Sequence, residues 1–205
     1  MLWKGINMKD VYILAVESSI AIVKNGKECI AMSISSQIDV HNKFGGVVPE
    51  IASRMHCENI LYVLEDCLSQ INLKIEDMDA IAVTYKPGLL GSLLVGLEFA
   101  KTVAAVYNKP LIGVNHLIGH IYANNIEDNL EFPLLALVVS GGHTELSIMH
   151  NNYEFELLGT TLDDAIGESF DKVARVLGFP YPGGPSIEKA ALLGKNTYNL
   201  TKPVN

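Results

Sequence analysis

Two histidines four residues apart, His116 and His120, are the clearest candidates for chemistry in this sequence. In a helix, side chains at this spacing lie on one face, about one turn apart. Neutral imidazole is the commonest protein ligand for zinc, iron, nickel or copper, so the pair could bind one metal ion if a third ligand came from elsewhere. Two ordinary helix histidines would show the same spacing, which by itself does not separate the two interpretations.

The segment before the pair indicates where it would lie. Residues 109–115 are predicted to form a short buried strand, and the histidines follow directly. Proteins that alternate strands and helices bind their ligands at the carboxyl ends of strands. The pair is therefore expected at a strand end.

Glycine-rich turns form a second group of candidates. Ser140-Gly141-Gly142 lies between two predicted strands, residues 133–139 and 143–149. Glycine lets backbone N–H groups approach phosphate oxygens, and hydroxyls add donors, so this turn could bind a phosphate or could be a plain hairpin. Gly91 and Gly96, near the start of a helix predicted over about residues 92–108, favour close helix packing over anion binding. They lack the Gly-Lys-Ser/Thr ending of a Walker loop.

Two carboxylates, Glu168 and Asp171, share one face of a helix predicted to run to about residue 177. Thr161 is expected to cap this helix, with Asp163 and Asp164 at its positive end. Solvated helix charge is the usual explanation for such a pair. Their nearness to the glycine turns also allows contacts to a ribose or adenosine.

The elements that must position these groups follow a mixed α/β plan. Strands are predicted over residues 11–17, 20–23 and 28–34, with Asn25-Gly26 forming a type I′ turn. A helix opening at Pro49 and a strand over 79–84 follow.

The second half begins again with strands around a hydroxyl-rich turn. This repetition is the plan of the actin-like ATPase fold, also called ASKHA, whose two lobes clamp a nucleotide. We expect an N-terminal extension (1–10), a complete first lobe containing the histidine helix (11–130), and an incomplete second lobe (131–205).

Composition narrows the classes of function. The 205 residues are 49% hydrophobic and 19% charged, with a net charge of −8, which predicts a globular protein that does not coat nucleic acid by itself. A local basic patch or a basic partner is still compatible with that charge. The longest apolar run, residues 89–107, is interrupted by polar and charged residues and predicts a buried helix, so we expect no membrane association.

Several longer motifs occur together and in order. They comprise Ser36-Gln37-Ile38, residues 45–54 from Gly45 to Arg54, the His116/His120 helix, residues 139–144, residues 164–172, and residues 181–185. Together they resemble the bacterial tRNA threonylcarbamoyladenosine transferase family (TsaD), formerly called glycoproteases, over nearly the whole chain from about Val11.

The resemblance implies a cytoplasmic acyltransferase with the actin-like fold. Such a tRNA N6-adenosine threonylcarbamoyltransferase moves a threonylcarbamoyl group from threonylcarbamoyl-AMP to the adenosine next to the anticodon of ANN-reading tRNAs. The implied partners are tRNA, a paralogous TsaB-like subunit and a TsaE-like ATPase. The implied cofactor is one divalent metal ion, iron or alternatively zinc, with threonylcarbamoyl-AMP or an adenine nucleotide as ligand.

The resemblance also implies roles for particular residues. The metal would be held by His116 and His120, with an aspartate near the family's C-terminus as the third ligand. The adenylate would be contacted by a larger set, namely Val138, Val139, Ser140, Gly141, Gly142, Asp171, Gly184 and Glu188.

Three departures from the family pattern bear on activity. Ser19 is followed directly by Ile20, where the family has Cys-Asp-Glu-Thr, so the expected aspartate is absent and no catalytic residue is assigned. Lys86 replaces a glycine, and the sequence stops at Asn205, before the third metal ligand. An inactive, truncated remnant that only binds partner subunits is the alternative function. A metalloprotease is disfavoured because no glutamate follows the first histidine.

Overall fold

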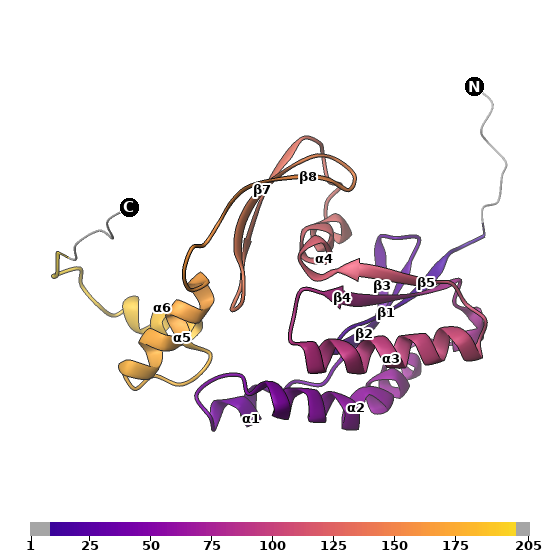
Figure 1. Cartoon of the computed structure of the whole chain (residues 1–205), viewed down its shortest axis with the longest axis horizontal. Helices are drawn as coiled ribbons and strands as arrows, with labels where there is room; N and C mark the ends of the chain where they lie inside the picture. The colour runs from indigo at the N-terminus through magenta and orange to yellow at the C-terminus, as the bar shows by residue number, and fades with distance from the viewer. Residues whose placement is uncertain (1–8, 200–205) are drawn as a thin grey trace.

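The computed structural model describes residues 9–199, which form two β-sheets and six α-helices (Figure 1). The strands are β1 (Tyr12–Val16), β2 (Ser19–Lys24), β3 (Glu28–Ile34), β4 (Ala80–Lys86), β5 (Leu111–Asn115), β6 (Leu134–Val139), β7 (Thr144–Asn151) and β8 (Glu154–Thr160). The helices are α1 (Ile38–Asn42), α2 (Pro49–Ser69), α3 (Leu90–Val106), α4 (His116–Ala123), α5 (Ile166–Val176) and α6 (Gly183–Ala191). Short 3-10 turns, η1 (Ile75–Asp77) and η2 (Asn124–Ile126), complete the set.

The first sheet has the strand order β3-β2-β1-β4-β5 and confirms the mixed α/β prediction. Strands β1, β2 and β3 form an antiparallel meander, whereas β4 and β5 run parallel to β1. The β2–β3 turn is the predicted one, with Asn25 at φ 54° and Gly26 at φ 70°. Positive φ at both central residues matches the twist of the flanking strands.

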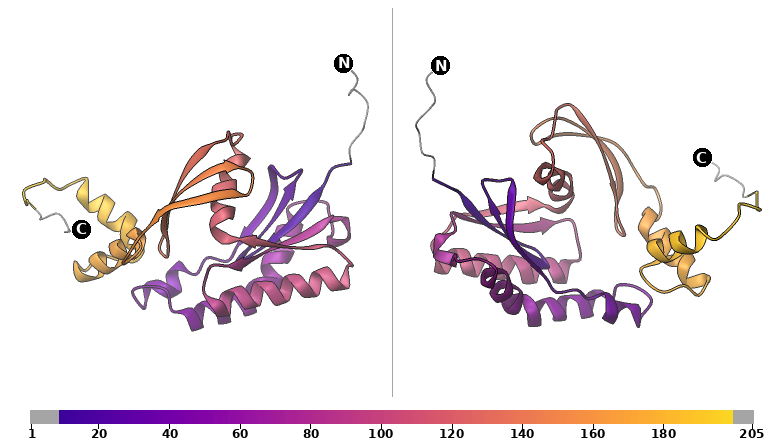
Figure 2. Two further views of the ribbon diagram at one scale, coloured as in Figure 1. Left: turned by 45° about the horizontal axis from the view of Figure 1, so that its top comes forward. Right: turned by 180° about the vertical axis from the view of Figure 1, so that it is seen from behind.

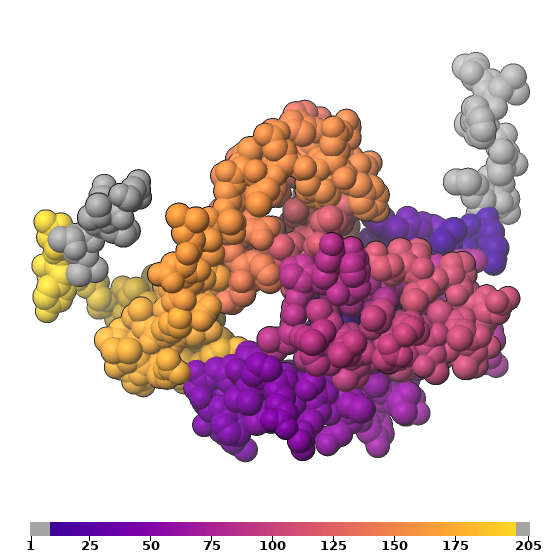
Figure 3. All heavy atoms as spheres, viewed as in Figure 1, coloured from indigo at the N-terminus to yellow at the C-terminus, as the bar shows by residue number. Residues whose placement is uncertain are grey.

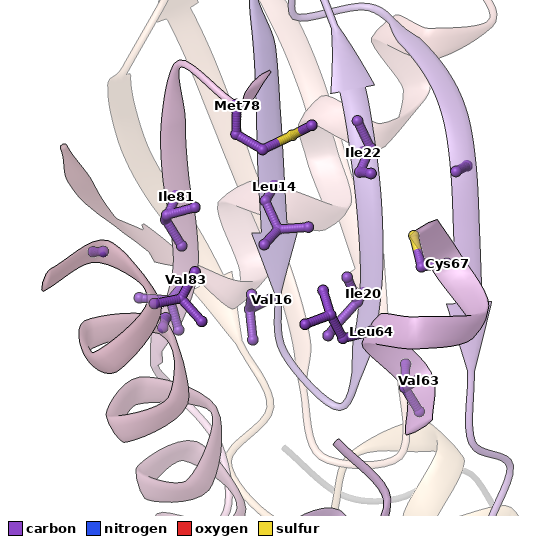
Figure 4. Packing of buried hydrophobic residues seen from close by; sticks show 14 residues of the cluster. Leu14, Val16, Ile20, Ile22, Val63, Leu64, Cys67, Met78, Ile81 and Val83 are labelled. Carbon is purple, nitrogen blue, oxygen red and sulfur yellow. The ribbon is translucent and has the colours of Figure 1, made fainter. Parts of the chain in front are cut away.

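The main core lies between this sheet and the helices α2 and α3, which cover one of its faces (Figure 1). Leu14, Ile22 and Ile81 point from three neighbouring strands toward the helices and are fully buried (Figure 4). Helix α2 begins at Pro49, as predicted, because proline suits the first helical position.

Glycines bring α3 close to its neighbours. A Cβ atom at Gly96 would lie 3.1 Å from the backbone oxygen of Glu17, and one at Gly91 would lie 3.0 Å from the Cβ of Ser53. These distances confirm the packing interpretation of the two glycines.

The prediction that β5 is buried was wrong. Leu111 and Ile112 are 41% and 44% exposed, because the strand order places β5 at the edge of the sheet, with a neighbour on one side only. The apolar composition of these residues indicates a strand, but it does not show whether the strand lies in the middle or at the edge of the sheet.

The second sheet repeats the opening meander in smaller form. Strands β6, β7 and β8 are antiparallel neighbours (Figure 2). Met149 is fully buried in a small core with Ile121 and Ala136. On the other face of β6, Leu135 and Leu137 are 64% and 66% exposed. The repetition matches the internal echo in the sequence, while the division into lobes at residue 130 stays a prediction.

Helix α5 begins later than predicted. Its first residue is Ile166, whose backbone N–H donates to the Thr144 hydroxyl at 2.9 Å, so the cap comes from β7 and not from Thr161. Thr161 instead donates its hydroxyl to the Asp164 carbonyl at 2.8 Å. A capping residue from a distant strand leaves no local sequence signal.

The last helices return toward the beginning of the chain. In Figure 3 the segment around α5 meets the loop between α1 and α2, and a Cβ atom at Gly45 would lie 3.6 Å from the Cδ atom of Arg175. Of the predicted N-terminal extension, residues 1–8 lie outside the described residues. Within residues 9–199, no helix is both long and apolar enough to cross a membrane.

Candidate functional site

A cleft of about 600 Å³ opens where β1, β4 and β5 end. The three strands are parallel, so their carboxyl ends meet at one edge of the sheet. The β6–β7 turn faces them across the cleft. The polar and glycine residues that line the cleft include Glu17, Gln37, His41, His56, Thr84, Gly88, Ser92, His116, Ser140, Gly141, Gly142 and His143.

The histidine pair lies at the start of α4. Asn115 caps this helix, since its side-chain oxygen accepts from the N–H groups of Leu117 at 2.9 Å and Ile118 at 3.3 Å. The cap fixes the first turn, and His116 and His120 stand on one face with their Nε2 atoms 3.1 Å apart. The predicted placement of the pair at a strand end is confirmed.

The geometry of the pair fits a shared metal ion. Two nitrogens bound to one tetrahedral zinc at its usual bond lengths are about 3.3 Å apart. Burial and the neighbouring His116 lower the pKa of His120, which favours the neutral form that a metal requires. Among the described residues, no group of three or more His, Cys, Asp or Glu side chains could hold a metal. The pair could supply two ligands of such a site, and a third would have to come from outside the described residues.

Sequence analysis did not single out Glu17 and Thr84, yet Glu17 contacts His116 and Thr84 contacts Glu17. The Nδ1 atom of His116 lies 2.9 Å from Oε1 of Glu17, and the Thr84 hydroxyl donates to Oε2 of Glu17 at 2.9 Å. A polar residue that ends a buried strand was the only signal available in the sequence.

A second network, unforeseen from the sequence, holds the wall formed by α1 and α2. His41, which is 5% exposed, contacts the Gln37 side-chain oxygen through Nε2 at 3.1 Å, and its Nδ1 accepts from the N–H of Val48 at 3.3 Å. The Gln37 amide nitrogen lies 3.1 Å from Nδ1 of His56. These contacts are all satisfied when both histidines are neutral.

This network predicts a pH effect on stability. Burial is the main cause that lowers the pKa of His56, and the neighbouring His41 lowers this pKa further. The Glu17 carboxylate acts in the opposite direction and raises it. A folded-state pKa below the ordinary value of 6.5 means that the unfolded chain takes up the proton more readily, so stability falls as pH drops below about 6.5. In His56→Asn, the asparagine side-chain oxygen can replace Nδ1 as acceptor. Urea unfolding of this variant should show a smaller loss of unfolding free energy between pH 7.5 and 5.5 than the wild type shows. An unchanged slope would contradict this assignment.

The Ser140-Gly141-Gly142 turn uses its hydroxyl internally. The Ser140 oxygen accepts from the N–H groups of Gly142 at 3.3 Å and His143 at 3.0 Å. The space beside Gly141 and Gly142 is open, since a Cβ atom at either would meet nothing within 4 Å. The open glycine backbone, and not the serine hydroxyl, is therefore the part of the turn accessible to a ligand.

The carboxylates predicted on α5 have different roles. Glu168 lies 3.1 Å from the Lys172 ammonium in an exposed ion pair, which agrees with the solvated interpretation. Asp171 accepts from the backbone N–H of Gly183 at 2.7 Å and so caps α6. Burial, with a further contribution from Asp171, raises the pKa of Tyr181 beside it.

The structure brings together only part of the predicted nucleotide set. Ser140, Gly141 and Gly142 face His116 in the main cleft. Val138 and Val139 line an adjacent hollow of about 500 Å³ with His120. Asp171 lines a third, of about 270 Å³, with Tyr181 and Arg175, and Gly184 and Glu188 lie on α6.

Fold and site together define a mixed α/β protein with a histidine pair and a glycine turn on opposite sides of a cleft at the strand ends. Residues 28–205 match the family TsaD, described as tRNA N6-adenosine threonylcarbamoyltransferase. The chain belongs to this family.

Relatives of that description are close in sequence. The protein of Thermosipho melanesiensis is 54% identical over 189 residues, which is 92% of this chain and 58% of the relative. That of Bacillus subtilis strain 168 is 53% identical over 199 residues, with 95% and 58% covered. The chain thus spans about 58% of the length of these relatives.

Solved structures are more distant. YeaZ from Pseudomonas aeruginosa is 16% identical at a TM-score of 0.48, with 73% of this chain and 65% of that one covered. A second P. aeruginosa protein, described as uncharacterized and similar to peptidase YEAZ, gives 17% identity and a TM-score of 0.49.

Proposed function

We propose that this chain carries the metal-binding and part of the adenylate-binding surface of a tRNA N6-adenosine threonylcarbamoyltransferase. The reaction moves the threonylcarbamoyl group of threonylcarbamoyl-AMP to the adenosine next to the anticodon of ANN-reading tRNAs. Family membership supports the reaction, and the single observation that supports the site is the 3.1 Å approach of the two Nε2 atoms at the cleft.

The proposed roles follow the geometry. His116 and His120 would hold the metal, iron or zinc, which when bound supplies a positive charge that polarises a carbonyl or neutralises a phosphate. The glycine backbone of Gly141 and Gly142 would approach the adenylate phosphate from the opposite wall. Asp171 keeps one carboxylate oxygen beyond the one that accepts from Gly183, and this oxygen would serve the ribose.

The remaining proposed contacts lie outside this cleft. Val138 and Val139 line the hollow next to it, and Gly184 and Glu188 lie on the helix that Asp171 caps. The net charge of −8 disfavours tRNA binding by this chain alone. The proposed partners are therefore tRNA, a TsaB-like subunit and a TsaE-like ATPase, acting with the chain in a cytoplasmic complex. The proposed lobes are residues 11–130 and 131–205.

A second candidate function is a subunit that binds partners without catalysis. The observation favouring it is the β1–β2 connection, in which only Glu17 and Ser18 lie between the strands and Glu17 donates its N–H to the Ser19 carbonyl at 3.0 Å. This short turn takes the place of the longer loop that carries the family's aspartate.

A transfer assay tests the proposal. The purified chain, threonylcarbamoyl-AMP, tRNA and the partner subunits should yield modified adenosine, with bound metal measured by mass spectrometry. His116→Ala should remove both the product and the metal. The matched control is His150→Ala on β7, an exposed histidine that pairs with Glu156 at 2.9 Å, and it should keep both.

Two results would each contradict part of this proposal. An inactive wild-type chain that still binds the partner subunit would support the second candidate function instead. Equal activity in His116→Ala and wild type would contradict the proposed metal site.

A further inference from the structure

The cleft contains one carboxylate that the proposed reaction leaves without a role. Glu17 directly follows β1, is half-buried, and directs Oε1 at His116 and Oε2 at Thr84. We infer that Glu17, held by Thr84, is a positioning residue that fixes the His116 ring with its Nε2 lone pair toward His120. The inference rests on the proposed function in one respect: the Nε2 lone pair of His116 is taken to bind the proposed metal.

The hydrogen bond to Glu17 selects one form of the imidazole. A carboxylate only accepts, so Nδ1 of His116, 2.9 Å from Oε1, must carry the proton. In a neutral ring this leaves Nε2 unprotonated, and Nε2 is the atom that lies 3.1 Å from Nε2 of His120. A carboxylate behind a ligating histidine fixes the tautomer and the ring orientation in the same way in many metal sites.

The carboxylate is itself held in place. Val16 pairs with Val83 in the parallel β1–β4 ladder, so Glu17 and Thr84 are neighbours one residue further along. The Thr84 hydroxyl, in a residue only 8% exposed, donates to Oε2 at 2.9 Å. This contact determines which way the carboxylate faces.

The backbone of Glu17 is fixed as well. Its N–H donates to the Ser19 carbonyl at 3.0 Å, and Gly96 of α3 packs so closely that an added Cβ atom would lie 3.1 Å from the Glu17 carbonyl oxygen. The contacts that link α3, Glu17 and His116 therefore restrict the His116 ring before a metal binds. Such preorganisation reduces the cost of ordering the ligand when it binds.

Nitrogen NMR of the histidine rings, recorded on the metal-free chain at pH 8, tests the inference directly. In the wild type, His116 should show a protonated Nδ1 and an unprotonated Nε2. In Glu17→Ala the ring should shift toward the opposite tautomer. Glu17→Gln, whose side-chain oxygen can still accept from Nδ1, should restore most of the wild-type pattern.

Zinc titration gives a second readout. Loss of a residue behind a metal ligand typically weakens affinity about 10- to 100-fold, which is the change expected for Glu17→Ala. Thr84→Val should weaken zinc binding less, because Glu17 would keep its contact with His116. The matched control is Glu156→Ala, which removes the carboxylate from the exposed His150 pair and should change neither the His116 tautomer nor zinc affinity.

The outcomes separate this inference from the proposed function. An unchanged tautomer in both Glu17→Ala and Thr84→Val, with zinc affinity within two-fold of wild type, would overturn it. If His116→Ala binds zinc as well as the wild type does, the metal site of the proposed function fails, and the tautomer comparison still decides the role of Glu17. If Glu17→Ala does not fold, zinc affinity in Thr84→Val decides the role of Glu17: a loss of more than two-fold supports the inference, and an affinity within two-fold of wild type overturns it.

Discussion

Replacing Leu14 with alanine is expected to destabilise the first sheet by about 3–5 kcal/mol, the cost of deleting a fully buried leucine side chain and leaving a cavity. Leu14 is 0% exposed and lies in the central strand β1, between β2 and β4 and beneath α2 and α3 (Figure 4). Its neighbours belong to four different elements, so they cannot all close around the cavity. Urea unfolding followed by circular dichroism measures the loss.

The matched control is Leu61→Ala on α2. Leu61 is 60% exposed, and alanine is the best helix former, so stability should change by less than about 0.5 kcal/mol. If Leu14→Ala and Leu61→Ala lower the free energy of unfolding by the same amount, the core of this sheet is not where the structure places it.

Replacing Gly183 with alanine is expected to separate α6 from α5. The added Cβ atom would lie 2.5 Å from the Phe170 carbonyl oxygen and 2.6 Å from the Cα of Asp171, both backbone atoms that cannot rotate away. Forced overpacking of this kind costs about 1–3 kcal/mol or more. It would also displace the N–H that Asp171 accepts at 2.7 Å. Amide hydrogen exchange in α6 should become at least ten times faster.

The next residue provides the control. A Cβ atom at Gly184 would meet nothing within 4 Å, and alanine in a helix is more favourable than glycine by about 0.5–1 kcal/mol. Gly184→Ala should therefore leave α6 exchange unchanged or slow it. Faster exchange in Gly184→Ala than in Gly183→Ala would contradict the packing of α6 on α5.

Local features of the sequence were sufficient to predict most of the elements. The Asn25-Gly26 turn and the helix opening at Pro49 are both present. Each depends on residues within a few positions of one another, where backbone conformation and helix spacing decide the result.

The candidate site was predictable in part, for the same reason. The spacing of His116 and His120 required only a helix, and the adjacent cap at Asn115 provides one. The nucleotide contacts could not be assembled this way, because the predicted residues fall on separate elements. The structure places Ser140, Gly141 and Gly142 in the main cleft, Val138 and Val139 in the hollow next to it, and Asp171 in a third hollow.

The mixed α/β pattern, its turns and the histidine pair could be predicted from the residues alone, because they follow from short-range chemistry. Long-range contacts were needed to show that β5 is an edge strand, that Thr144 caps α5, and that Glu17 contacts His116 while Thr84 holds Glu17. Glu17 and Thr84 are 67 residues apart and become neighbours through a parallel strand crossover. Contacts of that kind depend on which strands pair, and no local pattern of residue types encodes the pairing.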